Sequence, residues 1–168
     1  TGLIPVLDLH IAARAAGRER LQAAGLAGRP LAVHPGSGSP AKNWPGERFV
    51  ELIRRWRSKG GEAIAVLGEA DAAEAALLAR ELPDLPRLEG LSRVELAASL
   101  VECRAFLGND SGITHLAAAV GLPVVALFGP TNAEIWAPHG RCGVQVLHAP
   151  EGELERLPVS SVWAALTA

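Results

Sequence analysis

The sequence is poor in the residues that mark several classes of protein. It contains no methionine and only two cysteines, Cys103 and Cys142, among 168 residues. The cysteines are far apart, lack C-x-x-C spacing and have no clustered histidines beside them, which argues against a zinc site. Disulfides are uncommon in a reducing compartment, so we expect Cys103 to be a buried small residue. Because the chain starts at Thr1 without a methionine, we interpret it as a piece of a longer protein.

An excess of charge and a long apolar run are also missing. The 16 Lys and Arg residues and 18 Asp and Glu residues give a net charge of -2 and a pI near 6.2. A balanced charge without a basic patch argues against nucleic acid as a partner. No apolar run approaches the roughly 18 residues that span a bilayer, and no charged and then apolar leader opens the chain. We therefore expect a soluble, cytoplasmic protein without a transmembrane segment.

Helical and strand patterns alternate along the chain. Phe49, Leu52, Ile53 and Trp56 recur at the spacing of one helix face, and residues 123–128 are apolar throughout, as in a strand buried on both faces. We expect helices near 9–26, 46–59, 72–82, 92–101, 111–120 and 159–166, a short helix from about 132, and strands near 31–33, 63–67, 87–89, 104–107, 123–128 and 144–147. This order predicts an α/β protein with a doubly wound parallel sheet. We divide the chain into an N-terminal helical or linker segment, 1–30, and a domain, 31–168.

Ligands of such sheets bind outside the carboxyl ends of the strands, where the loops between strands and helices gather. The loop with the densest chemistry is 109–115, which reads N-D-S-G-I-T-H. A helix begins there, and its unpaired N–H groups and positive dipole end form a site for an anion such as phosphate. Ser111 and His115 lie one helical turn apart. The alternative is that Asp110 is an ordinary helix N-cap and His115 a partly buried side chain.

The loop 34–44 also follows a strand and leads into a helix. It holds two glycines, two hydroxyls and Lys42, which together suit a phosphate. Ser37 and Gly38 lie at its centre. The loop matches neither a Walker A motif nor G-x-G-x-x-G, and a solvated turn is the alternative.

Two further loops carry weaker signals. Glu69 and Asp71 follow the strand at 63–67, where a carboxylate suits the hydroxyls of a ribose, although Asp71 as a helix cap is at least equally plausible. Trp136 lies in the turn-rich segment 129–140, and tryptophan more often packs in a core than binds a ligand.

Taken in order, these segments resemble glycosyltransferase family 9, the ADP-heptose:lipopolysaccharide heptosyltransferases. The resemblance covers residues 31–140, and its matching strings are H-P-G-S at 34–37, A-K-N-W-P at 41–45, G-N-D-S-G-I-T-H-L-A-A-A at 108–119 and G-L-P-V-V-A-L-F-G-P-T-N at 121–132, followed by Trp136, Pro138 and Gly140. The string D-S-G-x-x-H-L-A-A with a downstream F-G-P-T-N is far more specific than any single loop.

The resemblance implies a two-domain enzyme of the GT-B type, of which this chain is the Rossmann-like C-terminal half that binds the nucleotide-sugar. The donor is ADP-heptose, with no tightly bound cofactor and no metal. The heptosyl group passes with inversion to the lipid A-Kdo inner core of lipopolysaccharide, which the missing N-terminal domain binds. The full enzyme is then cytoplasmic, with peripheral association at the inner face of the inner membrane of a Gram-negative-type bacterium, and the isolated fragment is inactive.

The resemblance also assigns roles to residues. The donor pyrophosphate is surrounded by six of them: Ser37, Gly38, Lys42, Ser111, Gly112 and His115. Asp110 contacts the donor sugar, and either Glu69 or Asp71 contacts the ribose or adenine. Among these, Lys42, Asp110 and His115 are the catalytic residues, which stabilise the donor and the leaving group.

The general base is expected in the missing domain. Asp8 is not that base, because it precedes a helical segment and lies outside the match. Two alternatives stay open. The parent protein is a nucleotide-binding module without catalysis, or it is a GT-B enzyme that uses a UDP-sugar, such as a 2-epimerase.

Overall fold

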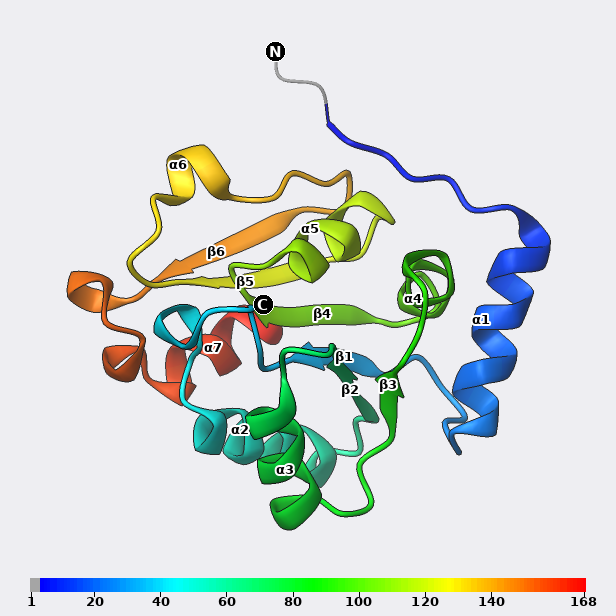
Figure 1. Ribbon diagram of the computed structural model, residues 1–168, viewed down its shortest axis with the longest axis horizontal. Helices are drawn as coiled ribbons and strands as arrows, with labels where there is room; N and C mark the ends of the chain where they lie inside the picture. Colours follow the sequence, from blue (N-terminus) through cyan, green and yellow to red (C-terminus); the bar gives the residue numbers. More distant parts are fainter. Residues whose placement is uncertain (1–3) are drawn as a thin grey trace.

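The computed structural model describes residues 4–168 and confirms the alternation of strands and helices. Six parallel strands form one sheet in the order β3-β2-β1-β4-β5-β6 (Figure 1). The strands are β1 (Leu31–His34), β2 (Ala63–Leu67), β3 (Arg87–Glu89), β4 (Ala105–Asn109), β5 (Val124–Phe128) and β6 (Val144–His148). This is the Rossmann-like doubly wound sheet that the sequence predicts.

The helices follow the expected positions to within a few residues at their ends. They are α1 (Ile11–Ala23), α2 (Gly46–Ser58), α3 (Ala72–Glu81), α4 (Arg93–Leu100), α5 (Gly112–Ala119), α6 (Ala133–Trp136) and α7 (Val159–Leu166). Three short 3₁₀ turns complete the chain: η1 (Pro40–Lys42), η2 (Pro150–Gly152) and η3 (Leu154–Arg156). Within residues 4–168, no helix has the length and apolar character needed to cross a membrane.

Each face of the sheet is covered by its own layer of helices, because successive side chains of a strand point to opposite faces. Leu31 and Val33 of β1 pack with α2, α3 and α7, whereas Ala32 between them packs with α1, α4 and α5. In Figure 1, α2 and α3 lie below β1 and β2. Both faces of every central strand are therefore buried, which explains the continuous apolar strand sequences.

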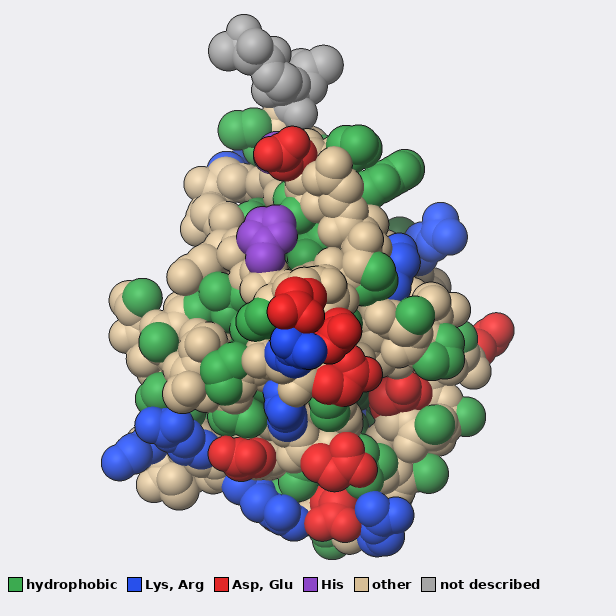
Figure 2. All heavy atoms as spheres, turned by 90° about the vertical axis from the view of Figure 1, so that its left-hand side faces the viewer, with side chains coloured by type: hydrophobic (Ala, Val, Ile, Leu, Met, Phe, Trp, Pro, Cys, Tyr) green, Lys and Arg blue, Asp and Glu red, His purple; other side chains and the backbone are tan. Residues whose placement is uncertain are grey.

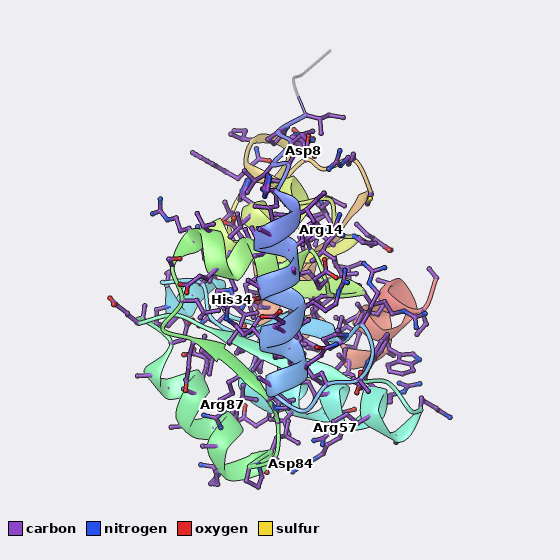
Figure 3. The ribbon with its side chains drawn as sticks, turned by 90° about the vertical axis from the view of Figure 1, so that its right-hand side faces the viewer. Asp8, Arg14, His34, Arg57, Asp84 and Arg87 are labelled. Atoms are coloured by element: carbon purple, nitrogen blue, oxygen red, sulfur yellow. The ribbon has the colours of Figure 1, made fainter. Side chains whose placement is uncertain are left out.

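The first helix, α1, packs along α4. A Cβ atom on Gly17 would lie 1.9 Å from the carbonyl oxygen of Ala98, so only glycine permits this approach. Arg14 and Arg18 each lie 3.1 Å from Glu102 in pairs that flank the contact. Figure 3 shows α1 in front of the sheet, with Arg14 in its first half. The division of the chain at residue 30 stays a prediction, and residues 1–3 of the predicted segment lie outside the described part.

The strand order reverses between β1 and β4, which are neighbours in the sheet. β2 and β3 continue on one side of this pair, and β5 and β6 continue on the other. The loops after β1 and β4 therefore diverge and leave a crevice at the carboxyl edge of the sheet, where ligands of this fold bind. Residues 34–44 and 109–115 are the two loops in question.

Candidate functional site

A cavity of about 730 Å³ lies at this crevice. It brings together all the predicted donor-binding residues except Lys42 and Asp110: Ser37, Gly38, Glu69, Asp71, Ser111, Gly112 and His115. They come from three separate loops, those after β1, β2 and β4. The three loops meet because the carboxyl ends of parallel strands share one edge of the sheet.

The first turn of α5 forms one wall of the cavity. Ser111 is the N-cap of this helix, and its hydroxyl oxygen accepts a hydrogen bond from the Thr114 amide at 3.3 Å. The alternative reading of Asp110 as the cap is therefore wrong. The amides of Gly112 and Ile113 precede His115, whose amide is the first to donate to a carbonyl of the helix, so they remain free to bind an anion. His115, one turn further, is exposed and lines the same cavity.

Asp110 instead forms an ion pair with Lys42. Lys42 lies on η1, and its Nζ is 2.9 Å from Oδ2 of Asp110, which is only 8% exposed. Neither side chain lines the cavity. The pair joins the loop after β1 to the loop after β4 at the edge of the crevice.

Asn109, the last residue of β4, holds the loop after β1 through hydrogen bonds to its backbone. It is fully buried, its Nδ2 donates to the Pro35 carbonyl at 2.8 Å, and its Oδ1 accepts from the Trp44 amide at 3.0 Å. Gly36 is required in this loop, because a Cβ atom there would lie 1.8 Å from Oδ1 of Asp71. The backbone of the loop is therefore held on both sides before any ligand binds.

Asp71 lines the cavity but is itself largely buried, at 3% exposed. Its Oδ2 accepts from the Gly68 amide at 2.6 Å and lies 2.9 Å from Nε2 of His34. Burial acts to raise the pKa of Asp71, but the hydrogen bonds from His34 and Gly68 outweigh it and lower that pKa. Asp71 precedes α3 without a side-chain capping bond. Glu69 is exposed and lines the cavity, and the choice between the two acids for the ribose stays a prediction.

The cavity also has aliphatic lining. Leu96 of α4, Ile113 and Leu116 of α5, and Pro5 from the N-terminal segment line it, together with Arg93. The lining thus combines amides, hydroxyls and imidazoles with aliphatic side chains. This combination suits a ligand with an anionic part and a flat apolar part.

Sequence reasoning missed three residues of this region. The sequence motifs contain His34 and Asn109 but indicate no role for them, and no local pattern points to Arg93. Trp136 was expected to be packed in the core, and this prediction is wrong, since the side chain is 58% exposed on α6. On the face seen in Figure 2, acidic and basic side chains are interleaved, without a broad patch of one sign.

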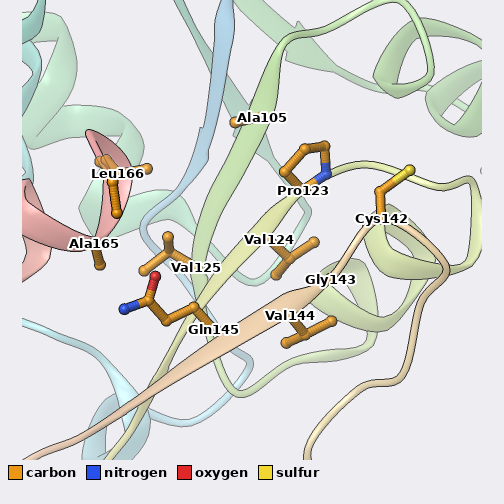
Figure 4. A pocket seen from close by; sticks show the side chains of 11 residues that line it. Ala105, Pro123, Val124, Val125, Cys142, Gly143, Val144, Gln145, Ala165 and Leu166 are labelled. Carbon is orange, nitrogen blue, oxygen red and sulfur yellow. The ribbon is translucent and has the colours of Figure 1, made fainter.

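A second hollow, of about 340 Å³, lies beside the end of α7 and the first residues of β5 and β6 (Figure 4). Its lining is mostly aliphatic, with Val124, Val125 and Val144, and Gln145 is its longest polar side chain. No predicted site residue lies there. Across residues 4–168, no cluster of three or more His, Cys, Asp or Glu side chains could hold a metal ion.

Both cysteines are free thiols. Cys103 is fully buried, as the sequence predicts, and burial raises its pKa to about 12. Cys142 is exposed.

Comparisons with known proteins agree with this geometry. The family model described as glycosyltransferase family 9 (heptosyltransferase) matches residues 5–158. Lipooligosaccharide heptosyltransferase 2 of Haemophilus influenzae is 34% identical over 142 residues, which cover 79% of this chain and 40% of that protein. The chain therefore spans well under half the length of this relative.

Two solved structures share the fold and part of the sequence. The structure of E. coli ADP-heptose lps heptosyltransferase II superposes with a TM-score of 0.79 and 26% identity, over 98% of this chain and 53% of that one. The E. coli heptosyltransferase WaaC with ADP gives a TM-score of 0.76 and 25% identity, over 84% of this chain and 44% of that one. With its motifs, its sheet order and the family match over nearly its whole length, the chain belongs to glycosyltransferase family 9.

Proposed function

We propose that this chain is the donor-binding domain of a heptosyltransferase, which transfers a heptosyl group from ADP-heptose to the inner core of lipopolysaccharide. The observation that carries the proposal is the cavity at the β1/β4 crevice, because its lining combines the first turn of α5 with aliphatic side chains. The family match and the ADP named with a related structure support an ADP-sugar as the ligand.

We place the diphosphate at the first turn of α5. The Gly112 and Ile113 amides, with the positive end of the α5 dipole, suit its negative charge. His115 adds a donor from the same helix, and Ser37 and Gly38 of the loop after β1 line the same cavity. The adenine then lies between α4 and α5 against Leu96 and Leu116, and the ribose lies near Glu69.

The proposed chemistry is an inverting displacement. A hydroxyl of the acceptor attacks the anomeric carbon, the bond from that carbon to the phosphate oxygen breaks, and ADP leaves with the electron pair. The hydroxyl proton passes to a base that we place in the other domain. Negative charge grows on the β-phosphate, where the α5 amides, His115 and Lys42 stabilise it, and one such donor is worth roughly 3 kcal/mol.

The Lys42–Asp110 pair gives these two residues their proposed roles. Asp110 holds Lys42 at the rim of the crevice, where an ammonium group can approach the diphosphate from outside the cavity. Asp110 itself faces the heptose. The lipid A-Kdo acceptor, its binding domain and the cytoplasmic face of the inner membrane belong to the same proposal, which the lipopolysaccharide acceptors named for the relatives support.

Calorimetry with ADP and UDP on the chain of 168 residues tests the donor class. We expect ADP to bind more tightly than UDP, and no heptosyl transfer by the chain alone, since half of the active site is absent. Preference for UDP would favour an epimerase-like enzyme. The absence of binding by either nucleotide would overturn the proposal.

A further inference from the structure

His34 occupies a position in the crevice that the proposed function does not use. It is the last residue of β1, it is 3% exposed, and it lies between the loop after β2 and the first turn of α5. Its Nε2 is 2.9 Å from Oδ2 of Asp71, and its Nδ1 is 3.3 Å from the hydroxyl oxygen of Ser111. One imidazole therefore contacts two loops that are separate in the sequence.

The partners fix how this imidazole is oriented. The Asp71 carboxylate is ionised at neutral pH, since its pKa is lowered, and an ionised carboxylate can only accept. Nε2 of His34 must therefore carry a proton and donate it to Asp71. Nδ1 is then directed at Ser111, the residue whose hydroxyl caps α5. The ring cannot turn over without losing both contacts.

Neighbouring groups also hold Asp71 and Ser111 in place. Oδ1 of Asp71 lies against Gly36, at a point where even a methyl group would collide. Ser111 also lies 3.1 Å from the hydroxyl of Thr114, which in turn donates to the Asn109 carbonyl. In the described residues, no buried side-chain polar atom lacks a partner. The connection from Asp71 through His34 to Ser111 is thus continuous.

We propose that His34 is a positioning residue, which joins the loop at Gly68–Asp71 to the cap of α5 so that both meet the nucleotide as one preformed surface. The inference rests on the proposed function, in which the ribose lies at the first of these loops and the diphosphate at the second. Such preorganisation raises the affinity for the nucleotide, because the free energy of binding then includes no cost for ordering the two loops. His34 itself need not touch the ligand.

Two substitutions separate the two contacts. The amide of His34→Gln reaches as far as Nε2, so it retains a donor for Asp71 and loses the contact at Nδ1. The amide of His34→Asn ends near the position of Nδ1, so it retains a partner for Ser111 and loses Asp71. The matched control is His148→Gln, because His148 also ends a strand, β6, but is exposed and outside the cavity.

The first readout is ADP affinity measured by calorimetry. We expect each His34 variant to bind ADP about 3- to 10-fold more weakly, the effect of one lost hydrogen bond, and the control to bind as the unaltered chain does. Equal ADP affinity in the unaltered chain and both His34 variants would overturn the inference while leaving the proposed function intact. Failure of the unaltered chain itself to bind ADP would overturn the proposed function, and the inference with it.

The second readout distinguishes positioning from general support of the fold. Asp71→Asn and Ser111→Ala change residues that contact His34 but not each other, so a double-mutant cycle on ADP affinity measures their coupling through the imidazole. We expect the double variant to lose clearly less affinity than the product of the two single losses. Losses that simply multiply would contradict the inference. This cycle keeps His34 in place, so it remains decisive if the His34 variants do not fold.

Discussion

Replacing Gly36 with alanine puts a methyl group into the space of the Asp71 carboxylate. The added Cβ would lie 1.8 Å from Oδ1 and 2.4 Å from Cγ, both far inside contact distance. Asp71 must then move away from its donors, the His34 ring at 2.9 Å and the Gly68 amide at 2.6 Å. Hydrogen bonds to a charged group contribute about 1.5 to 3 kcal/mol each, so losing both costs roughly 3 to 6 kcal/mol.

The assay is chemical denaturation followed by circular dichroism, which gives the free energy of unfolding. Gly112→Ala is the matched control, because Gly112 lines the same cavity, has open space around its Cα and has no positive φ angle. We expect a large loss of stability for Gly36→Ala and a small change for the control. A Gly36→Ala protein within about 0.5 kcal/mol of the unaltered chain, the range of ordinary surface substitutions, would refute the reasoning about this contact.

Three further predictions concern the site and the thiols. In the complete enzyme, Lys42→Ala and His115→Ala should each lower turnover by roughly 100-fold, since one well-placed donor to the departing phosphate is lost, and unchanged steady-state rates in both variants would contradict these roles. The pKa of Asp71 is lowered below 3.8 in the folded chain, so its ionised carboxylate stabilises the fold above that pH. This stabilisation is lost as the pH falls through the pKa that Asp71 has in the folded chain. Acid titration of unfolding should therefore show a steeper loss below pH 4 for the unaltered chain than for Asp71→Asn. A thiol reagent at pH 8 should label Cys142 alone in the native chain, because Cys103 is buried with a pKa of about 12, and a mass increase of two labels before unfolding would refute this.

The fold could be predicted from the sequence because periodicity records burial directly. The apolar runs at β2 and β5 are buried at every position, and the stripe of α2, Phe49 to Trp56, is the face that packs on the sheet. The parallel order of the strands was enough to predict that the loops after β1, β2 and β4 meet at the carboxyl edge of the sheet. These signals are local, so one sequence is enough to read them.

The contacts inside the site could not be read in the same way. Asn109 and His34 bond to residues that lie 37 to 77 positions away in the chain, and no local pattern specifies such partners. Aspartate and serine are equally good helix caps, so the sequence could not tell that Ser111 caps α5 and that Asp110 pairs with Lys42. Exposure of Trp136 likewise depends on the neighbours of α6.

The central claim is that a nucleoside diphosphate binds with its phosphates on the first turn of α5. Titration of the ¹⁵N-labelled chain with ADP, followed by amide chemical shifts in NMR spectra, tests it most directly. The account predicts the largest changes at the Gly112 and Ile113 amides, with smaller changes at Gly38 and Glu69. Changes centred instead on Gly143 and Val144, at the hollow beside α7, would contradict it.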